Sequence, residues 1–289
     1  MTTIRNPVEW SLDQFRHVGH GMSNAGQAVR HAQATLHSPA PAVRRIAYGD
    51  LRDALAKGFE DFGAYRSDVI FLCVIYPAIG LVLGRLALGY SALPLLFPLA
   101  TGFALIGPLA ALGLYEMSRR REHGAAVSWA TPFRVFRAPA FGPIAVLGLI
   151  LVAIFLLWLF AAAEIYKATL GPAAPASLGA FLGAVFTTGA GWAMIGVGVG
   201  LGFLFALLVL VISVVSFPLM LDRDVGLDTA IATSWRAVRA NPGPSAAWGL
   251  IVAAGLALGS IPFFIGLIVV LPVLGHATWH LYRKLVAPG

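Results

Sequence analysis

The chain has 289 residues and is far more apolar than a soluble protein of that length, because 58% of its residues are hydrophobic and only 11% are charged. Soluble domains are about 45–50% apolar and about 25% charged. This composition excludes an ordinary soluble enzyme and predicts a polytopic membrane protein. The formal net charge of +7 would also suit a nucleic-acid-binding protein, but no recognition-helix pattern or stacking platform accompanies the arginines.

The first 45 residues are mostly polar, and we interpret them as a mobile arm. The arm has no short apolar core followed by small residues, so it is not a signal peptide. The sequence Ser38-Pro39-Ala40-Pro41 is typical of a linker, because proline interrupts helices. Four apolar side chains keep helical spacing earlier in the arm and predict an amphipathic helix: Val8, Leu12, Phe15 and Met22.

The remainder, residues 46–285, is predicted to be an all-α membrane domain with about six transmembrane helices. A spanning helix needs about 20 apolar residues. The segment 171–190 contains a Gly-Pro turn and a short apolar stretch, and is predicted to be either interfacial or re-entrant. The six predicted spans are about 69–88, 93–116, 141–163, 192–221, 245–260 and 261–282.

A pattern typical of an amphipathic surface helix occurs three times, each time ahead of an apolar hairpin. The large apolar side chains recur at i, i+4, i+8 and i+11, which places them on one stripe of a helix. A helix of this kind lies in the membrane interface. The three copies are Leu51, Leu55, Phe59 and Phe62, then Ala125, Trp129, Phe133 and Phe136, and finally Leu227, Ile231, Trp235 and Val238.

These copies divide the membrane domain into three repeats, about 49–120, 123–223 and 225–285, each an interfacial helix followed by a spanning hairpin. The second helix of each hairpin carries one proline: Pro108, Pro218 and Pro272. All three units enter the membrane from the same side. They are therefore predicted to be parallel repeats around a pseudo-threefold axis along the membrane normal.

The basic residues indicate the orientation, because they gather in the loops on one side and Lys167 is essentially the only one in the opposite loops. Lys and Arg concentrate in cytoplasmic loops, so both termini are predicted to be cytoplasmic. Each basic residue near anionic headgroups contributes about 1 kcal/mol. The side chains expected to face the lipid headgroups are Arg119, Arg120, Arg121, Arg134, Arg137, Arg236 and Arg239.

Polar residues follow the three prolines at steps that stay on nearly one helix face. They form a candidate polar cluster: Glu116, Asp222, Arg223, His276 and His280. The alternative is structural, with prolines that only pack the hairpins and polar ends that reach the headgroups. Asp222 can also cap the next helix. His276 and His280 lie one turn apart, which suits a metal or haem ligand as well as an aromatic-rich headgroup belt. We expect no bound metal or cofactor.

Five stretches carry a resemblance to a known family: Ile75-Tyr76-Pro77, Phe97-Pro98-Leu99-Ala100, Gly113-Leu114-Tyr115-Glu116-Met117-Ser118-Arg119-Arg120, Ser216-Phe217-Pro218-Leu219-Met220-Leu221-Asp222-Arg223 and Gly275-His276-Ala277-Thr278-Trp279-His280-Leu281-Tyr282-Arg283. They resemble a bacterial family of predicted integral membrane proteins that is catalogued only as a domain of unknown function. The similarity covers about residues 45 to 285 and implies an inner-membrane location. Some relatives are labelled as a cytochrome c oxidase subunit, but an oxidase core needs more spanning helices and more histidines.

The leading hypothesis is a non-enzymatic accessory, assembly or lipid-organising component of the inner membrane, with a possible link to a respiratory complex. Its expected partners are anionic lipids on the cytoplasmic side and possibly another membrane protein. The chain has no phosphate-binding glycine loop, nucleophile elbow or dinucleotide fingerprint. The alternative is a small transporter or channel that uses the polar cluster, and a third hypothesis is a haem or metal redox protein.

Overall fold

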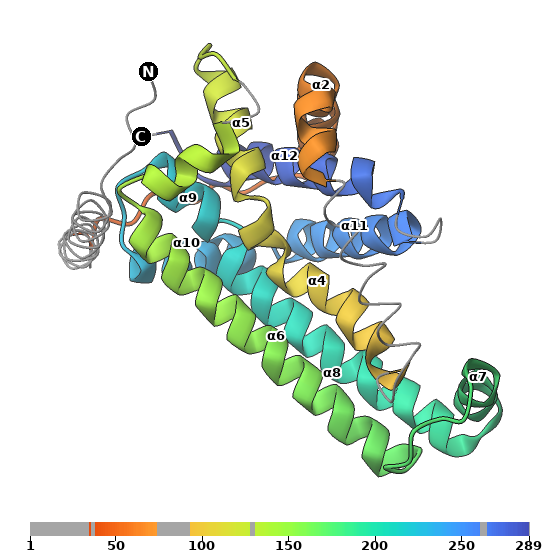
Figure 1. Ribbon diagram of the computed structural model, residues 1–289. Coiled ribbons are helices and arrows are strands. Elements are labelled where there is room, and N and C mark those ends of the chain that lie inside the picture. The colour runs from red at the N-terminus through yellow and green to blue at the C-terminus, as the bar shows by residue number, and fades with distance from the viewer. Residues whose placement is uncertain (1–34, 36–37, 74–92, 128–130, 261–264, 289) are drawn as a thin grey trace, which may run out of the picture.

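The computed structural model describes residues 35, 38–73, 93–127, 131–260 and 265–288 (Figure 1). Within these ranges the chain is helical, and its one extended pairing is an isolated antiparallel bridge between Val43 and Val286. The predicted all-α class is therefore confirmed for the described chain. The predicted amphipathic helix of the N-terminal arm lies outside the described residues.

Ten α-helices and two short 3-10 helices make up this part of the chain. The α-helices are α2 (Tyr48–Cys73), α4 (Leu96–Ala110), α5 (Leu112–Glu122), α6 (Phe141–Thr169), α7 (Leu178–Thr187), α8 (Gly189–Ser213), α9 (Ser216–Asp222), α10 (Leu227–Ala240), α11 (Pro242–Ser260) and α12 (Leu267–Leu285). The 3-10 helices are η1 (Leu93–Leu95) and η2 (Thr131–Arg137).

Four helical stretches among the described residues are long and apolar enough to cross a membrane: Phe97–Glu122, Phe141–Thr169, Gly189–Asp222 and Pro242–Ser260. The predicted span 69–88 lies largely outside the described residues. Helix α12, which overlaps the predicted span 261–282, is not among the four, because two histidines, Arg283 and Lys284 make its second half polar. The six-helix count and the threefold repeat therefore stay predictions.

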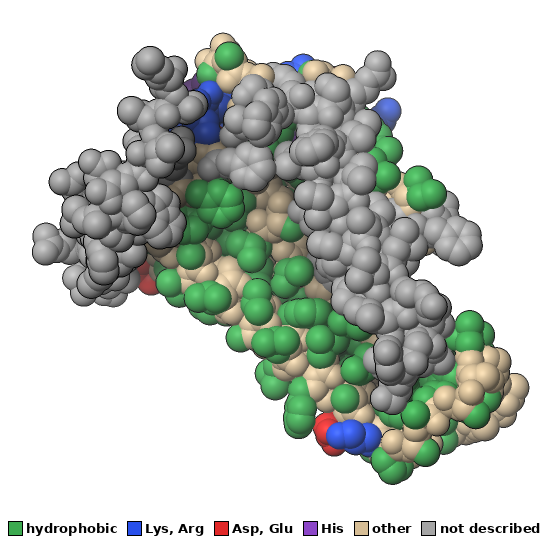
Figure 2. Space-filling view, in the orientation of Figure 1, with side chains coloured by type: hydrophobic (Ala, Val, Ile, Leu, Met, Phe, Trp, Pro, Cys, Tyr) green, Lys and Arg blue, Asp and Glu red, His purple; other side chains and the backbone are tan. Residues whose placement is uncertain are grey.

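Helices α4, α6 and α8 form the long apolar part of the molecule (Figure 1). Trp158 of α6 is buried at their junction, where its ring packs 5.8 Å from that of Phe205 and its indole N–H donates to the Pro98 carbonyl at 3.1 Å. Elsewhere on these helices, large apolar side chains such as Leu149 and Phe160 are exposed. Figure 2 shows that hydrophobic side chains cover much of this part of the surface. Such an exposed apolar surface suits lipid contact.

The polar part of the molecule is built on α2 and α12, which pack against each other in antiparallel directions. Near the start of α2, Asp50 and Asp53 each accept a hydrogen bond of 2.8 Å from Lys284. Further along, Gly58 brings the two backbones together, since a Cβ there would lie only 2.7 Å from the Val273 carbonyl oxygen. This close approach places the next turn of α2, with Asp61, directly against α12.

The segment 38–47 forms hydrogen bonds with residues of the C-terminal part of the chain. The backbone N–H of Arg44 donates to the Leu285 carbonyl at 2.7 Å. The buried amide of Asn241 accepts from the Ile46 N–H at 2.8 Å and donates to the Arg44 carbonyl at 3.0 Å. The last residues of the predicted arm, 38–45, thus make specific contacts, whereas residues 1–34 lie outside the described chain.

Candidate functional site

Five polar side chains meet where the helices α2, α5 and α12 come together, and we call this group the Asp61 network. It consists of Asp61 from α2, Ser118 and Arg121 from α5, and His276 and His280 from α12. Asp61, Ser118 and His276 are respectively 4%, 1% and 0% exposed. Buried ionisable groups are costly unless they are paired, so this cluster is the strongest candidate site in the described chain.

The Asp61 carboxylate is the centre of the network. One of its oxygens, Oδ2, accepts from Ser118 Oγ at 2.5 Å and from His280 Nε2 at 2.9 Å. The other, Oδ1, accepts from Arg121 Nη1 at 2.5 Å. Three donors therefore compensate the charge of one buried carboxylate, which is the arrangement that makes a buried ion pair tolerable.

His276 is joined to this carboxylate through Ser118. Its ring nitrogen Nδ1 lies 2.8 Å from Ser118 Oγ. Because the serine hydroxyl has one proton and donates it to Asp61, Nδ1 of His276 must be the protonated nitrogen that donates to Ser118. The other nitrogen, Nε2, is buried and forms no hydrogen bond of normal geometry with the described residues, although the backbone of Leu114 interacts with the ring.

Asp61 and His276, the buried acid and the buried base of this network, each have one charge state at neutral pH. Burial alone would raise the pKa of Asp61, but hydrogen bonds from His280 and Ser118 and the positive charges nearby lower it to about 2. Burial lowers the pKa of His276 to about 4, against the attraction of Asp61, which favours the charged ring. At neutral pH the network therefore contains an ionised Asp61 and a neutral His276.

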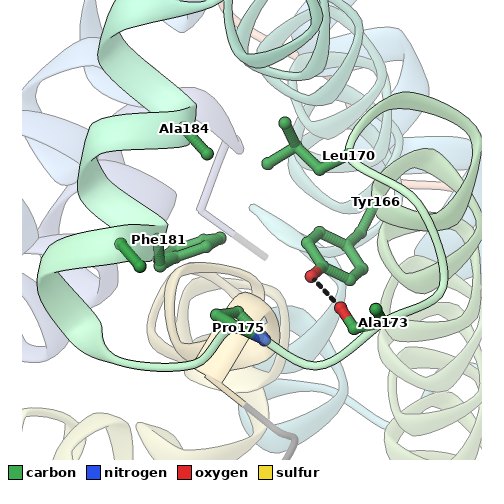
Figure 3. Close-up of a pocket in the computed structure, with 7 residues that line it drawn as sticks. Tyr166, Leu170, Ala173, Pro175, Phe181 and Ala184 are labelled. Atoms are coloured by element: carbon green, nitrogen blue, oxygen red, sulfur yellow. Dashed lines mark hydrogen bonds between the residues drawn. The ribbon is translucent and has the colours of Figure 1, made fainter.

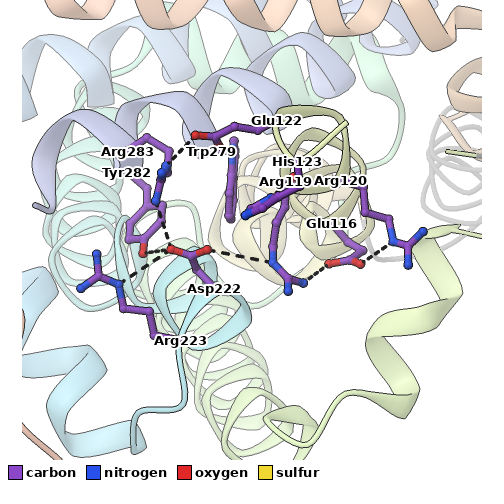
Figure 4. A network of polar contacts seen from close by, with 10 residues as sticks. All are labelled: Glu116, Arg119, Arg120, Glu122, His123, Asp222, Arg223, Trp279, Tyr282 and Arg283. Atoms are coloured by element: carbon purple, nitrogen blue, oxygen red, sulfur yellow. Dashed lines mark hydrogen bonds and ion pairs between the residues drawn. The ribbon is translucent and has the colours of Figure 1, made fainter. Parts of the chain in front are cut away.

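A second group of polar side chains, which we call the Asp222 network, joins residues of α5, α9 and α12 (Figure 4). Asp222 accepts from the Tyr282 hydroxyl at 2.7 Å and from Arg283 Nη1 at 3.3 Å. Glu122 accepts from Trp279 Nε1 and from Arg283 Nε, each at 3.0 Å. Because Arg283 contacts both carboxylates, this network ties α12 to the ends of α5 and α9.

Arg119 extends the Asp222 network to Glu116. Its guanidinium donates to Glu116 Oε2 at 2.8 Å, and its Nε lies 4.0 Å from Asp222 Oδ1. Arg120 donates to the other oxygen of Glu116 at 3.0 Å. Arg223, beside Asp222, donates to the Ala287 carbonyl and so contacts the end of the described chain.

The five residues of the predicted polar cluster thus fall into two groups. Glu116, Asp222 and Arg223 belong to the Asp222 network, while His276 and His280 belong to the Asp61 network. Asp61 and Ser118 are not among the residues predicted from the sequence, although a signal for Asp61 existed. Asp61 continues the buried stripe of Leu51, Ala54 and Gly58, so a carboxylate stands where the α2 pattern calls for a small or apolar residue.

The arginines predicted to face lipid differ in their surroundings. Arg119, Arg120 and Arg121 are only partly exposed and form ion pairs with Glu116 or Asp61. Arg134, Arg236 and Arg239 are exposed. Arg137 lies in η2, where its side chain is outside the described part of the structure. The exposed three are therefore the side chains with the clearest access to headgroups.

Neither network is arranged as a metal site. Among the described residues, no group of three or more His, Cys, Asp or Glu side chains is placed to hold a metal ion. In the Asp61 network, one oxygen of Asp61 and the facing nitrogen of His280 are already used by their mutual hydrogen bond. What these residues can do chemically is hold and transfer protons.

A small pocket lies at the opposite end of the long helices, between α6 and α7 (Figure 3). Its volume is about 140 Å³, and its lining is largely apolar, with Tyr166 and Phe181 on facing sides. The Tyr166 hydroxyl donates to the Ala173 carbonyl at 2.7 Å and so fixes the connecting loop. The tyrosine hydroxyl is thus used structurally, and we assign no ligand to the pocket.

The long apolar helices and the charged end define a helical integral membrane protein. Residues 95–222 match the family model described as "Predicted integral membrane protein (DUF2189)", a domain of unknown function. The family expected from the sequence is therefore confirmed for this part of the chain, and nothing in the match supports the oxidase label. The match contains Glu116, Ser118 and Asp222, whereas Asp61, His276 and His280 lie outside it. No curated protein and no solved structure matches the chain.

Proposed function

We propose that the protein is a non-enzymatic component of the bacterial inner membrane that binds anionic lipid headgroups on the cytoplasmic side and thereby organises lipid or a membrane partner. The observation that carries this proposal is the unequal charge of the two ends of the spanning helices. At one end of α6, Lys167 is paired with Glu164 at 2.7 Å. The other end of the bundle has the arginines of both networks and the exposed Arg134, Arg236 and Arg239.

Exposed aromatic side chains on the same surface support a headgroup contact. Phe59, Phe136 and Trp235 are 57%, 64% and 55% exposed, and one of them comes from each of the three segments predicted to be amphipathic. Basic residues stand one or two positions away from each ring in the sequence. Aromatic anchors beside basic residues are characteristic of segments that lie in the membrane interface, and burying each ring contributes about 1.5–3 kcal/mol.

The experiment is a lipid competition on the purified, detergent-solubilised full chain. Native mass spectrometry after addition of equal amounts of phosphatidylglycerol and phosphatidylcholine should show predominantly phosphatidylglycerol adducts. One basic residue near anionic lipid contributes about 1 kcal/mol, or roughly fivefold in affinity. We therefore expect Arg239→Gln to reduce phosphatidylglycerol retention severalfold, and Arg134→Gln with Arg236→Gln and Arg239→Gln to reduce it further.

The matched control is Lys167→Gln, which removes one exposed positive charge from the opposite end of α6. It should leave phosphatidylglycerol retention nearly unchanged. Equal retention of the two lipids by the unmodified chain, or the same loss in Lys167→Gln as in Arg239→Gln, would contradict the proposal. The transport alternative stays a prediction, and a liposome flux assay with Glu116→Ala and His280→Ala is its test.

A further inference from the structure

In the Asp61 network, one buried hydrogen-bond acceptor is left without a donor. The hydroxyl proton of Ser118 serves the 2.5 Å contact with Asp61. The Nδ1 proton of His276 serves the 2.8 Å contact with Ser118. In the neutral ring this leaves Nε2 as a bare acceptor, in a residue that is 0% exposed, without a hydrogen-bond donor among the described residues.

The opposite tautomer does not remove this deficit. If His276 carried its proton on Nε2, Nδ1 would accept the Ser118 proton, and the short contact between Ser118 and Asp61 would then need a proton on the carboxylate. Both arrangements are completed by the same change, which is the addition of one proton to the network. The backbone of Leu114 interacts favourably with the charged ring and so supports the added proton.

We propose that Asp61, Ser118, His276 and His280 form a proton-binding site, in which His276 takes up a second ring proton and Asp61 is its counter-charge. Uptake converts the neutral imidazole to imidazolium and breaks no bond within the protein. The hydrogen bonds from Nδ1 to Ser118 and from Ser118 to Asp61 remain as they are. This inference rests on the local geometry and does not depend on the proposed lipid function.

His280 gives the site a connection to solvent. Its side chain is 14% exposed, whereas that of Asp61 is 6% exposed and that of His276 is fully buried. His280 Nε2 contacts the same carboxylate oxygen that Ser118 contacts. A chain of hydrogen bonds therefore runs from His280 through Asp61 and Ser118 to Nδ1 of His276, and it couples the charge of the buried ring to the partly exposed histidine.

The charged groups around His276 come from all three helices of the network. Asp61 of α2 favours the protonated ring, while Arg121 of α5 and His280 of α12 disfavour it. Burial has the largest effect and lowers the pKa of His276 to about 4. The proton is therefore expected to bind in mild acid, with Asp61 already ionised, because the pKa of Asp61 is about 2.

The test is a pH titration of the ring nitrogens by NMR on the full chain, with ¹⁵N-labelled histidine. The chain has seven histidines, and His276→Asn identifies the signals that belong to position 276. We expect the His276 ring to be neutral with its proton on Nδ1 at pH 7, and to become protonated on Nε2 well below the ordinary histidine pKa of 6.5. The transition should be reversible and should occur while the near-ultraviolet circular dichroism of the folded protein persists.

Asp61→Asn separates a proton site from a merely structural hydrogen-bond network. Loss of an adjacent opposite charge shifts a pKa by about one to three units, so protonation of His276 should move to lower pH by at least about one unit in this variant. If Asp61→Asn does not fold, Ser118→Ala should produce a downward shift as well, because it removes the link between ring and carboxylate. Glu164→Gln, at the far end of α6, should change nothing.

A His276 ring that stays neutral until the protein unfolds would overturn the proposal. So would a ring that titrates at the same pH in the unmodified chain and in the variant that folds. A ring that already carries its proton on Nε2 at pH 7, with Nδ1 accepting from Ser118, would overturn it too, because the added proton would then go to the Asp61 carboxylate and not to Nε2 of His276.

Discussion

Gly58 is the residue on which the packing of α2 against α12 depends most directly. A Cβ at this position would lie 2.8 Å from both the backbone nitrogen and the Cβ of Ala277. These atoms cannot move away independently because they are part of the opposing helix. We therefore expect Gly58→Ala to destabilise the protein by about 1–3 kcal/mol through overpacking, seen as a lower midpoint of thermal unfolding.

The same helix offers a control for this substitution. Gly63 is exposed, and a Cβ there would meet nothing within 4 Å. Gly63→Ala should therefore stabilise the helix by up to about 1 kcal/mol, because alanine has the higher helix propensity. Equal effects of the two substitutions would show that α2 does not pack on α12 in this register.

Single residues also show how far the candidate site could be predicted from sequence. His276 and His280 were identified because two histidines one turn apart in an apolar segment are conspicuous. Their partner Asp61 is 219 positions from His280, and no local spacing links residues so distant. A pattern within one helix shows which side chains share a face, but it does not show which other helix will cover that face.

Among the elements, α2 is the one whose attachment to the protein should respond to pH. The pKa of His276 is about 4 in the folded protein instead of 6.5, so the neutral ring is the form that folding favours. The contribution of the neutral ring to the free energy of unfolding is complete above pH 6.5 and is lost as the pH falls from 6.5 toward 4. The pKa of Asp61 falls from 3.8 to about 2 on folding, so its contribution is lost only below pH 3.8.

Between pH 7 and pH 4.5, His276 is thus the dominant contributor of the two, and we expect a loss of about 2–3 kcal/mol of unfolding free energy. Hydrogen exchange of the α2 amides should accelerate over the same range, because α2 is held by this network. His276→Asn should be less stable at pH 7 but nearly independent of pH down to 4.5. An unmodified chain with constant stability from pH 7 to 4.5 would show that this histidine does not titrate on unfolding.

Some helices are easier to predict from the sequence than others, for a physical reason. Segments α6 and α8 are continuous apolar stretches, and bilayer-length hydrophobic helices are the strongest signal that a sequence contains. Helix α12 begins as such a stretch, but its second half buries Trp279 and Tyr282 against other helices. Apolar periodicity alone does not distinguish a helix buried in protein from one buried in lipid, so the predicted span 261–282 stays a prediction.

At the scale of the whole molecule, the two ends of the long helices differ in charge. The exposed Arg134, Arg236 and Arg239 lie at the end that contains both networks, while the α6–α7 loop has Lys167 paired with Glu164. Positively charged loops are retained in the cytoplasm during insertion. The same asymmetry that supports lipid binding therefore also predicts the orientation in the membrane, and the two can be tested independently.

Cysteine accessibility tests this orientation directly, because Cys73 is the only cysteine in the chain. In a Cys73→Ala background, Ala174→Cys introduces a thiol into the exposed α6–α7 loop, and Arg239→Cys introduces one at the arginine-rich end. In bacterial spheroplasts, a membrane-impermeant maleimide should label position 174 at once and position 239 only after the membrane is permeabilised. The reverse order would place the arginines on the outer surface and contradict the orientation expected from the positive-inside rule. Labelling of both positions without permeabilisation would mean that the chain does not cross the membrane between them.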